Sequence, residues 1–282
     1  MKVLVTGGSG GLGRWVVREL RAHGYGVVSA DRRPPAEAEP GARYAELDLT
    51  DVKGVQRVLD GCEAVVHLAA IPAPGGRPDE VVFGNNVLGT FAVLQAASRL
   101  GVRKVVTASS TAALGAAFAA RPFGPRYLPI DEAHPLSPQD PYGLSKEVGE
   151  RVGAAFGRTG LSVSALRFHF VAQPGVAAAR AAAFRLDAET CARELGGYVD
   201  VRDAARACRL GLEADTPGFE AFNITAADTL SRTPTLELVR HHYPEVELRG
   251  PVEGFASAWS TEKARRLLGY APRYSWRDEA AA

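Results

Sequence analysis

The sequence lacks an excess of charge of one sign. Its 33 basic residues are balanced by 32 acidic residues, which gives a formal net charge of +1. Proteins that bind nucleic acid or an acidic membrane surface usually carry a strong basic excess. We therefore expect a small-molecule partner that is neutral or weakly charged, and we expect neither nucleic acid nor a membrane.

Cysteines and long apolar runs are also scarce. The three cysteines, Cys62, Cys191 and Cys208, are an odd number at wide spacings, which excludes a disulfide framework and a zinc knuckle. The longest uncharged run, residues 105–120, has 16 residues and includes serines and threonines, so it is too short and too polar to span a bilayer. We expect a soluble protein in a reducing cytoplasm.

Short β-branched runs alternate with helical patterns over the first 170 residues. KVLVT, GVVSAD, AVVHLAA and KVVTASS are the clearest of these runs. The alternation predicts βαβ units, and hence an α/β fold with a doubly wound parallel sheet of the Rossmann type. The pattern loosens after Phe168. We predict a dinucleotide-binding domain over residues 1–167 and a smaller substrate-binding lobe over residues 168–282, partly interleaved with it.

A glycine-rich turn, TGGSGGLG at residues 6–13, directly follows the first predicted strand. Gly7 permits a tight turn, Gly10 lets the backbone approach a pyrophosphate, and Gly13 allows close packing of helix on strand. A merely flexible turn is the alternative, but the position inside a βαβ unit favours dinucleotide binding. The predicted contacts of this turn also include Ser9, Gly11 and Leu12.

Asp31 ends the second predicted strand, 18 residues past Gly13. A carboxylate there can accept hydrogen bonds from the adenosine ribose and would repel a 2′-phosphate, so NAD is favoured over NADP. An ordinary acid at a strand end is the alternative. Arg32 and Arg33 complicate the prediction, because a guanidinium beside the ribose suits a phosphate.

Asp48 follows the third predicted strand in the run LDLTD. Its carboxylate can meet the adenine amino group, with Leu49 beside it in the predicted cofactor site. It can equally be an acid at the start of a helix, together with Thr50 and Asp51. The residues alone leave both interpretations open.

Tyr142 and Lys146 share one face of a predicted helix, because they lie at positions i and i+4 in PYGLSKE. A hydride can leave a carbinol carbon only as the hydroxyl loses its proton, so a base is needed near the nicotinamide. Tyrosine has a free pKa of about 10, and a nearby ammonium favours its phenolate. The spacing alone does not distinguish this pair from a solvated helix that begins at Pro141.

The order of these motifs resembles the short-chain dehydrogenase/reductase superfamily, and most closely its extended branch, the NAD-dependent epimerase/dehydratase family. The resemblance rests on the glycine turn, the acid after strand two, HLAA at 67–70, NNVLGT at 85–90, a serine after strand five and YxxxK. The segments PIDEAHPLSPQDPYGLSK, YVDVRDAARA and STEKARRLLGYAPRYSW extend it over essentially the whole chain.

The resemblance implies a role for each matching residue. Tyr142 would be the catalytic acid/base, and Lys146 would lower its pKa and hold the nicotinamide ribose. Ser110 would hydrogen-bond the reacting oxygen, with Thr111 as the alternative register. A homodimer through the helices around Asn86 and Tyr142 is implied in the same way. The cofactor groove would further be lined by Asn86, Leu68, Ala69 and Ala70.

Two departures from the family pattern bear on the reaction. Ala112 and Ala113 stand where the 4,6-dehydratases carry an Asp-Glu pair, so dehydration is not expected. Phe170 stands where nucleotide-sugar enzymes place an asparagine after strand six. The length also resembles that of family members that oxidise free sugar acids. A substrate smaller than a nucleotide sugar is therefore plausible.

The substrate residues are the least readable part of the sequence. Arg167, His169, Arg180 and Arg185 are candidates for binding a carboxylate or phosphate, although each can equally be a surface or buried paired group. The neighbouring His241 and His242 have no third ligand in register, so we predict no metal site. The predicted function is an NAD-dependent oxidoreductase. The alternatives are an NAD-dependent sugar epimerase and a non-catalytic dinucleotide-sensing protein.

Overall fold

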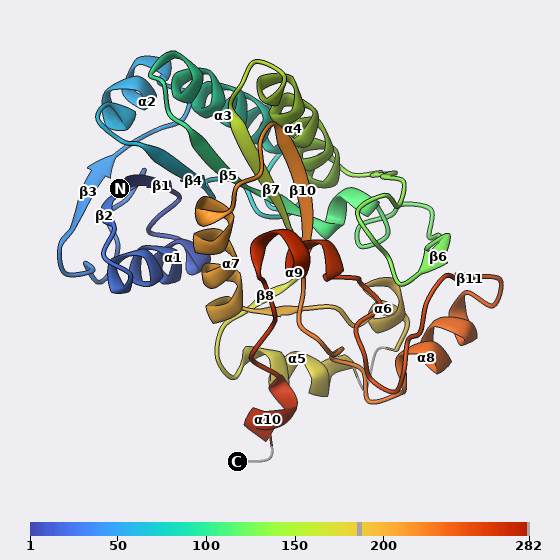
Figure 1. Ribbon diagram of the computed structural model, residues 1–282. Coiled ribbons are helices and arrows are strands. Elements are labelled where there is room, and N and C mark those ends of the chain that lie inside the picture. Colours follow the sequence, from blue (N-terminus) through green and yellow to red (C-terminus); the bar gives the residue numbers. More distant parts are fainter. Residues whose placement is uncertain (185–187, 281–282) are drawn as a thin grey trace.

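A seven-stranded parallel sheet forms the centre of this computed structural model, which describes residues 1–184 and 188–280. The strand order is β10-β7-β5-β4-β1-β2-β3, and Figure 1 shows the sheet between two layers of helices. The predicted doubly wound α/β fold is confirmed. The strands are β1 (Lys2–Thr6), β2 (Gly26–Asp31), β3 (Ala42–Glu46), β4 (Ala64–His67), β5 (Lys104–Ser110), β7 (Ser162–Phe168) and β10 (Phe219–Ile224).

Helices cover both faces of the sheet. One layer consists of α1 (Gly11–Ala22) and α7 (Val201–Glu213), which contact each other. The other layer consists of α2 (Val52–Leu59), α3 (Asp79–Arg99) and α4 (Pro141–Gly157), which pack side by side (Figure 1). Strands that are buried on both faces have continuous apolar sequences. For this reason apolar and polar residues do not alternate along β4 (AVVH) and β1 (KVLVT).

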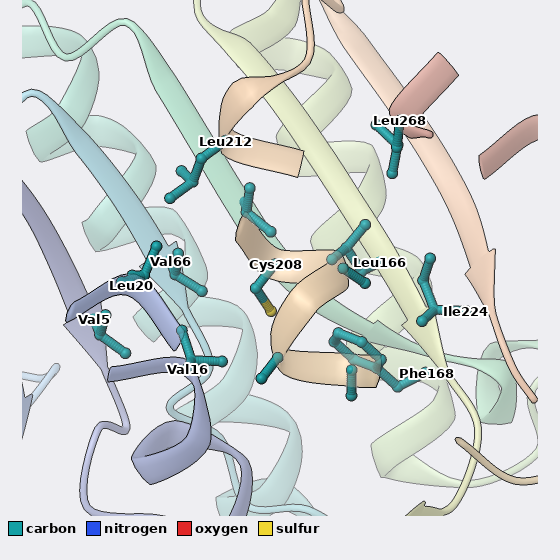
Figure 2. Close-up of a cluster of buried hydrophobic side chains, with 14 of the residues drawn as sticks. Val5, Val16, Leu20, Val66, Leu166, Phe168, Cys208, Leu212, Ile224 and Leu268 are labelled. Atoms are coloured by element: carbon teal, nitrogen blue, oxygen red, sulfur yellow. The ribbon is translucent and has the colours of Figure 1, made fainter. Parts of the chain in front are cut away.

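The core is divided in two by the sheet. Val5 of β1 packs with α1 and α7, as Figure 2 shows for Val16, Leu20 and Cys208. The next residue back, Leu4, points to the other face and packs with the layer of α2 and α3. This alternation follows from the period of two along a strand, so each strand contributes to both cores.

Helix α3 is long and apolar. Among the described residues, α3 alone is long and apolar enough, by length and composition, to cross a membrane. Buried helices of soluble proteins pass the same test, and α3 here packs against α2, α4 and strands of the sheet. Its apolar character is thus accounted for by the core.

A smaller lobe lies beyond the ends of β5, β7 and β10 at the bottom of Figure 1. β10 comes from the second half of the chain but pairs with β7, so the segments before and after residue 168 are interleaved in space. The lobe and its connections contain the 3-10 helix η1 (Thr111–Leu114), β6 (Tyr127–Leu128), β8 (Val171–Ala172), α5 (Val176–Phe184), α6 (Ala188–Arg193), β9 (Val199–Asp200), α8 (Thr235–His242), β11 (Glu247–Leu248), α9 (Glu262–Leu268) and α10 (Trp276–Ala280).

Candidate active site

A cavity of about 700 Å³ opens at the carboxyl ends of the strands, between the sheet and the smaller lobe. This is the place where open α/β sheets bind ligands. Most residues predicted from the sequence meet around this one cavity. Those that line it are Gly7, Gly10, Gly11, Leu12, Gly13, Asp31, Arg32, Asp48, Leu49, Leu68, Ala69, Ala70, Ser110, Thr111, Tyr142, Lys146, His169 and Arg180.

The glycine turn forms one wall of the cavity and has no room for side chains. Gly7 has a φ of +71°, and a Cβ there would lie 2.7 Å from the Ala69 backbone nitrogen. A Cβ on Gly13 would overlap the Gly7 carbonyl oxygen. Gly10 caps α1 without a side-chain hydrogen bond, so the first N–H groups of the helix face the turn. A cradle of this kind fits a pyrophosphate.

Asp31 lies at the end of β2, where a ribose would be bound. Its Oδ2 accepts a hydrogen bond from the Ser9 N–H (3.2 Å), and its Oδ1 accepts one from the Arg32 N–H (2.8 Å). Ser9 itself is not among the described residues that line the cavity; its Oγ donates to the Arg33 carbonyl (2.8 Å). Ser9 therefore holds the Asp31 carboxylate in place. It does not form part of the cavity wall, in contrast to the prediction from the sequence.

Asp48 lies where it can serve both roles that the sequence left open, as a ligand contact and as an acid before a helix. It lines the cavity, and its Oδ1 also accepts hydrogen bonds from the N–H (2.9 Å) and the hydroxyl (2.8 Å) of Thr50. These hydrogen bonds lower the pKa of Asp48. The carboxylate is therefore ionised and held in the turn before α2, with its other oxygen available to a ligand.

Asn86 does not line the groove, so that prediction is wrong. The side chain is 4% exposed, its Oδ1 accepts from the Ile71 N–H (2.8 Å), and its Nδ2 donates to the Ile71 carbonyl (3.0 Å) and to Ser145 Oγ (3.1 Å). Successive residues of a helix point about 100° apart, and the neighbouring Asn85 lines the cavity. Asn86 instead ties the wall of the cavity to α4.

Tyr142 and Lys146 lie on one face of α4, as predicted. Asp140 caps this helix by accepting from the Gly143 N–H (2.8 Å), and Pro141 occupies its first turn. The Lys146 ammonium donates to the Ala108 carbonyl (2.8 Å) and lies 5.5 Å from the centre of the Tyr142 ring. Since Ala108 belongs to β5, the ammonium is fixed next to the strand end that carries Ser110.

The ionisation of the pair is controlled first by burial. Burial raises the pKa of Tyr142, a hydrogen bond with Ser110 acts in the opposite direction, and the charge of Asp140 raises it further. Burial lowers the pKa of Lys146 to about 8, against the opposing charge of Glu150. The expected depression of the Tyr142 pKa by Lys146 is therefore not found: burial dominates, and the opposing influence comes from Ser110.

Arg167 does not face the substrate. It lies 8% exposed in the core, where its Nε and Nη2 donate to the two oxygens of Glu150 at 2.8 and 2.7 Å. Ser109 Oγ also donates to Glu150 (2.6 Å). This cluster joins α4, β5 and β7 directly behind Ser110. The predicted role of Arg167 in binding a substrate anion is wrong, since its charge is already paired.

His169 lines the cavity, but both of its ring nitrogens are engaged. Its Nδ1 lies 2.8 Å from the Phe170 N–H and so accepts a hydrogen bond, which leaves Nε2 to donate to the Glu194 carbonyl at 3.0 Å. Burial lowers the pKa of His169 to about 4. We therefore assign it a neutral, structural role and withdraw it as a ligand for an anionic group.

Arg180 also lines the cavity, and it is paired with Glu194 through Nη2, at 2.8 and 2.7 Å from the two carboxylate oxygens. The sequence did not point to Glu194, nor to Phe118 in the loop after η1, which also lines the cavity and packs edge-on against Tyr142. Both lie in segments without a readable pattern. Arg185 lies outside the described residues.

Known proteins resemble this chain over its whole length. The model of the family described as "NAD dependent epimerase/dehydratase family" matches residues 3–225. Two solved structures cover nearly all of both chains. MoeE5 in complex with UDP-glucuronic acid and NAD is 27% identical with a TM-score of 0.72, covering 100% of this chain and 97% of its own. The UDP-glucose 4-epimerase of Thermotoga maritima, solved with UDP-glucose, is 26% identical with a TM-score of 0.74, covering 99% and 96%.

Similar curated proteins include both epimerases and dehydrogenases. A putative UDP-glucose 4-epimerase of Methanocaldococcus jannaschii is 34% identical over 59% of this chain and 54% of its own length. A uronate dehydrogenase of Pseudomonas syringae pv. tomato is 32% identical over 59% of this chain and 58% of its own length. The chain thus spans little more than half the length of these two relatives.

Proposed function

The chain belongs to the NAD-dependent epimerase/dehydratase family, and on that premise we propose that it is an NAD-dependent oxidoreductase acting on a secondary alcohol or ketone of a small sugar-like substrate. One observation carries the proposal. Ser110, Tyr142 and Lys146 line the same cavity as the glycine turn and Asp31, and the Lys146 ammonium lies 5.5 Å from the centre of the Tyr142 ring. A proton-transferring group and a dinucleotide site thus share one space.

The residues present fit NAD as the cofactor. The glycine wall and the start of α1 would hold the pyrophosphate. Gly7 and Gly13 are needed for the shape of this turn, because a Cβ at either would collide with the backbone of Ala69 or of Gly7. Asp31 would accept hydrogen bonds from the adenosine ribose and disfavour a 2′-phosphate. When bound, NAD supplies the acceptor or donor of the hydride.

Tyr142 moves the proton. Because burial raises its pKa, the phenol holds its proton in the free protein, which suits a general acid in the direction of reduction. In the direction of oxidation it must accept a proton from the substrate hydroxyl through its phenolate, which the Lys146 ammonium favours. Ser110 would hydrogen-bond the reacting oxygen and fix its distance from the Tyr142 oxygen.

An epimerase is the second candidate, because two proteins similar to this chain are named as UDP-glucose 4-epimerases. The same three side chains would then oxidise the substrate transiently and reduce the opposite face. Phe170 argues against this alternative. By resemblance, nucleotide-sugar members of the family have an asparagine at this position that binds the diphosphate, and an apolar ring cannot replace it. A non-catalytic sensor would need none of Ser110, Tyr142 and Lys146.

Absorbance of the reduced nicotinamide distinguishes these functions. Stoichiometric accumulation of reduced cofactor with a sugar supports net oxidation, and product without accumulation supports epimerisation. Tyr142→Phe should abolish turnover with little change in NAD affinity, because it removes the proton-transferring hydroxyl only. Tyr274→Phe is the matched control, since Tyr274 is 39% exposed and outside the cavity. Unchanged turnover in Tyr142→Phe would refute the proposed mechanism.

The proposed assembly is a homodimer formed through α3 and α4. Leu88 and Phe91 of α3 and Leu144 of α4 are 64, 42 and 41% exposed, which leaves apolar area on this layer that a second copy can cover. Leu88→Glu should reduce the molar mass measured by light scattering to that of one chain, and an unchanged mass would exclude this interface. The cytoplasmic location stays a prediction.

A further inference from the structure

The substrate end of the cavity has an unusual balance of charge. Among the described residues that line the cavity, the charged side chains are Asp31, Arg32, Asp48, Lys146, Arg180 and Glu194. The first three belong to the adenosine end, and Lys146 is held at the Ala108 carbonyl beside Tyr142. Only Arg180 and Glu194 remain for the substrate, and their charges cancel.

The Arg180–Glu194 pair is fixed in position on two sides. The guanidinium carbon lies 4.4 Å from the centre of the Phe170 ring and 5.0 Å from that of Phe184. The two charged side chains are only 32 and 16% exposed. The carbonyl of Glu194 also accepts the hydrogen bond from His169, which restrains the backbone of the same residue. Swinging Arg180 away would therefore break the ion pair and both aromatic contacts.

The pair still offers both a donor and an acceptor. Only Nη2 of Arg180 donates to Glu194, which leaves Nη1 without a hydrogen bond in the described structure, while its Nε is buried and unpartnered. Each carboxylate oxygen of Glu194 has a further lone pair. A hydroxyl, which donates and accepts, can use both groups at once. A carboxylate or phosphate can use only Arg180 and is repelled by Glu194.

We propose that the Arg180–Glu194 pair selects an uncharged, polyhydroxylated substrate, such as a free aldose, over a uronate or a sugar carrying a diphosphate. This inference rests on the proposed oxidoreductase function and narrows its substrate class. The selection works by repulsion as much as by attraction, because the Glu194 carboxylate, which is only 16% exposed, already occupies the place beside Arg180 that an anionic substrate would need. Phe170 packs against the Arg180 guanidinium, and the other described residues that line the cavity near the pair add no further charge.

Matched sugars test the proposal directly. D-galactose and D-galacturonate, and likewise D-glucose and D-glucuronate, differ only in a hydroxymethyl group against a carboxylate. With NAD at saturation, we expect kcat/KM of the parent protein to be at least about tenfold higher with the neutral member of each pair. Calorimetric titration of each sugar into the NAD-loaded protein should give the same order of affinity.

Glu194→Gln is the informative variant, since it keeps the shape of the side chain and removes the repulsive charge. It should raise kcat/KM for the uronates by about tenfold and lower it for the neutral sugars. Glu189→Gln is the matched control, because it removes the same charge from α6, where the side chain is 77% exposed and paired only at the surface with Arg193. The ratio between the two classes should not move in this control.

The selection would be overturned by a parent that prefers or binds only uronates, or by a kcat/KM ratio between the two classes that Glu194→Gln leaves unchanged. Binding of no sugar from either class would overturn it as well. The ratio of kcat/KM for neutral sugars to that for uronates is measured on the parent protein, so the proposal can still be tested if Glu194→Gln fails to fold. Oxidation of the uronates at least as efficiently as of the neutral sugars, with reduced nicotinamide formed, would keep the oxidoreductase and reject the selection. Preferential binding of neutral sugars without hydride transfer would keep the selection and reject the oxidoreductase.

Discussion

Replacing Glu150 with alanine should lower the free energy of unfolding by about 3–5 kcal/mol, the usual cost of leaving one member of a buried ion pair alone. Glu150 accepts three hydrogen bonds, one from Ser109 and two from Arg167, and both charged side chains are 8% exposed. Burial lowers the pKa of Arg167, but the hydrogen bonds and charge of Glu150 outweigh this and raise it. The guanidinium cannot escape the penalty by losing its proton.

A double variant separates the cost of the unpaired Arg167 charge from the cost of shortening the Glu150 side chain. In Glu150→Leu/Arg167→Met no charge stays buried without a partner, so most of the loss in Glu150→Ala should be recovered. Glu147→Ala is the matched control on the same helix. Its i,i+4 partner Arg151 is 79% exposed, so the loss of this pair should cost less than about 1 kcal/mol.

Chemical denaturation followed by circular dichroism measures these free energies, provided that the transition is two-state. A loss in Glu150→Ala no larger than that in Glu147→Ala would refute the reasoning. So would a double variant as unstable as the single one. Either result would mean that the cluster behind Ser110 does not depend on the charge of Glu150.

Three further predictions concern the cofactor and pH. Asp31→Ala should narrow the preference for NAD over NADP, measured as the ratio of their KM values, and a parent that already prefers NADP would contradict the role of Asp31. Gly7→Ala should abolish NAD binding measured by fluorescence titration, whereas Gly101→Ala, with a similar φ of +70° but no atom within 4 Å of its added Cβ, should strain the backbone and keep NAD affinity. Burial lowers the pKa of Lys104 from 10.5 to about 8, so between about pH 8 and 10.5 the unfolded chain binds the proton more strongly, and the contribution of Lys104 to stability rises with pH in that window. Thermal unfolding of Lys104→Met across this range should show a smaller rise than the parent, and equal slopes would argue against the shift.

The sequence predicted the parts of the site that depend on backbone geometry. The glycine turn, the acid at the end of β2 and the i,i+4 pair on α4 follow from local conformation, and each lies where it was expected. Errors arose where tertiary partners decide the role of a side chain. Nothing local to Arg167 reveals that Glu150 will pair with it, and only the register of α3 separates Asn85 from Asn86. Glu194 was missed because its role depends on Arg180, which lies 14 residues away in an irregular lobe.

The pairing of β10 with β7 has a consequence for how the chain reaches its native state. Until residues 219–224 are available, the strand Ser162–Phe168 has an open edge, and the apolar residues on it are exposed to other chains. The contacts that close this edge are distant in sequence, which slows folding and prolongs that exposure. A fragment ending near residue 167 would thus carry the glycine turn, Ser110, Tyr142 and Lys146 and still tend to aggregate. During synthesis, the nucleotide-binding half depends on the later half for a finished sheet.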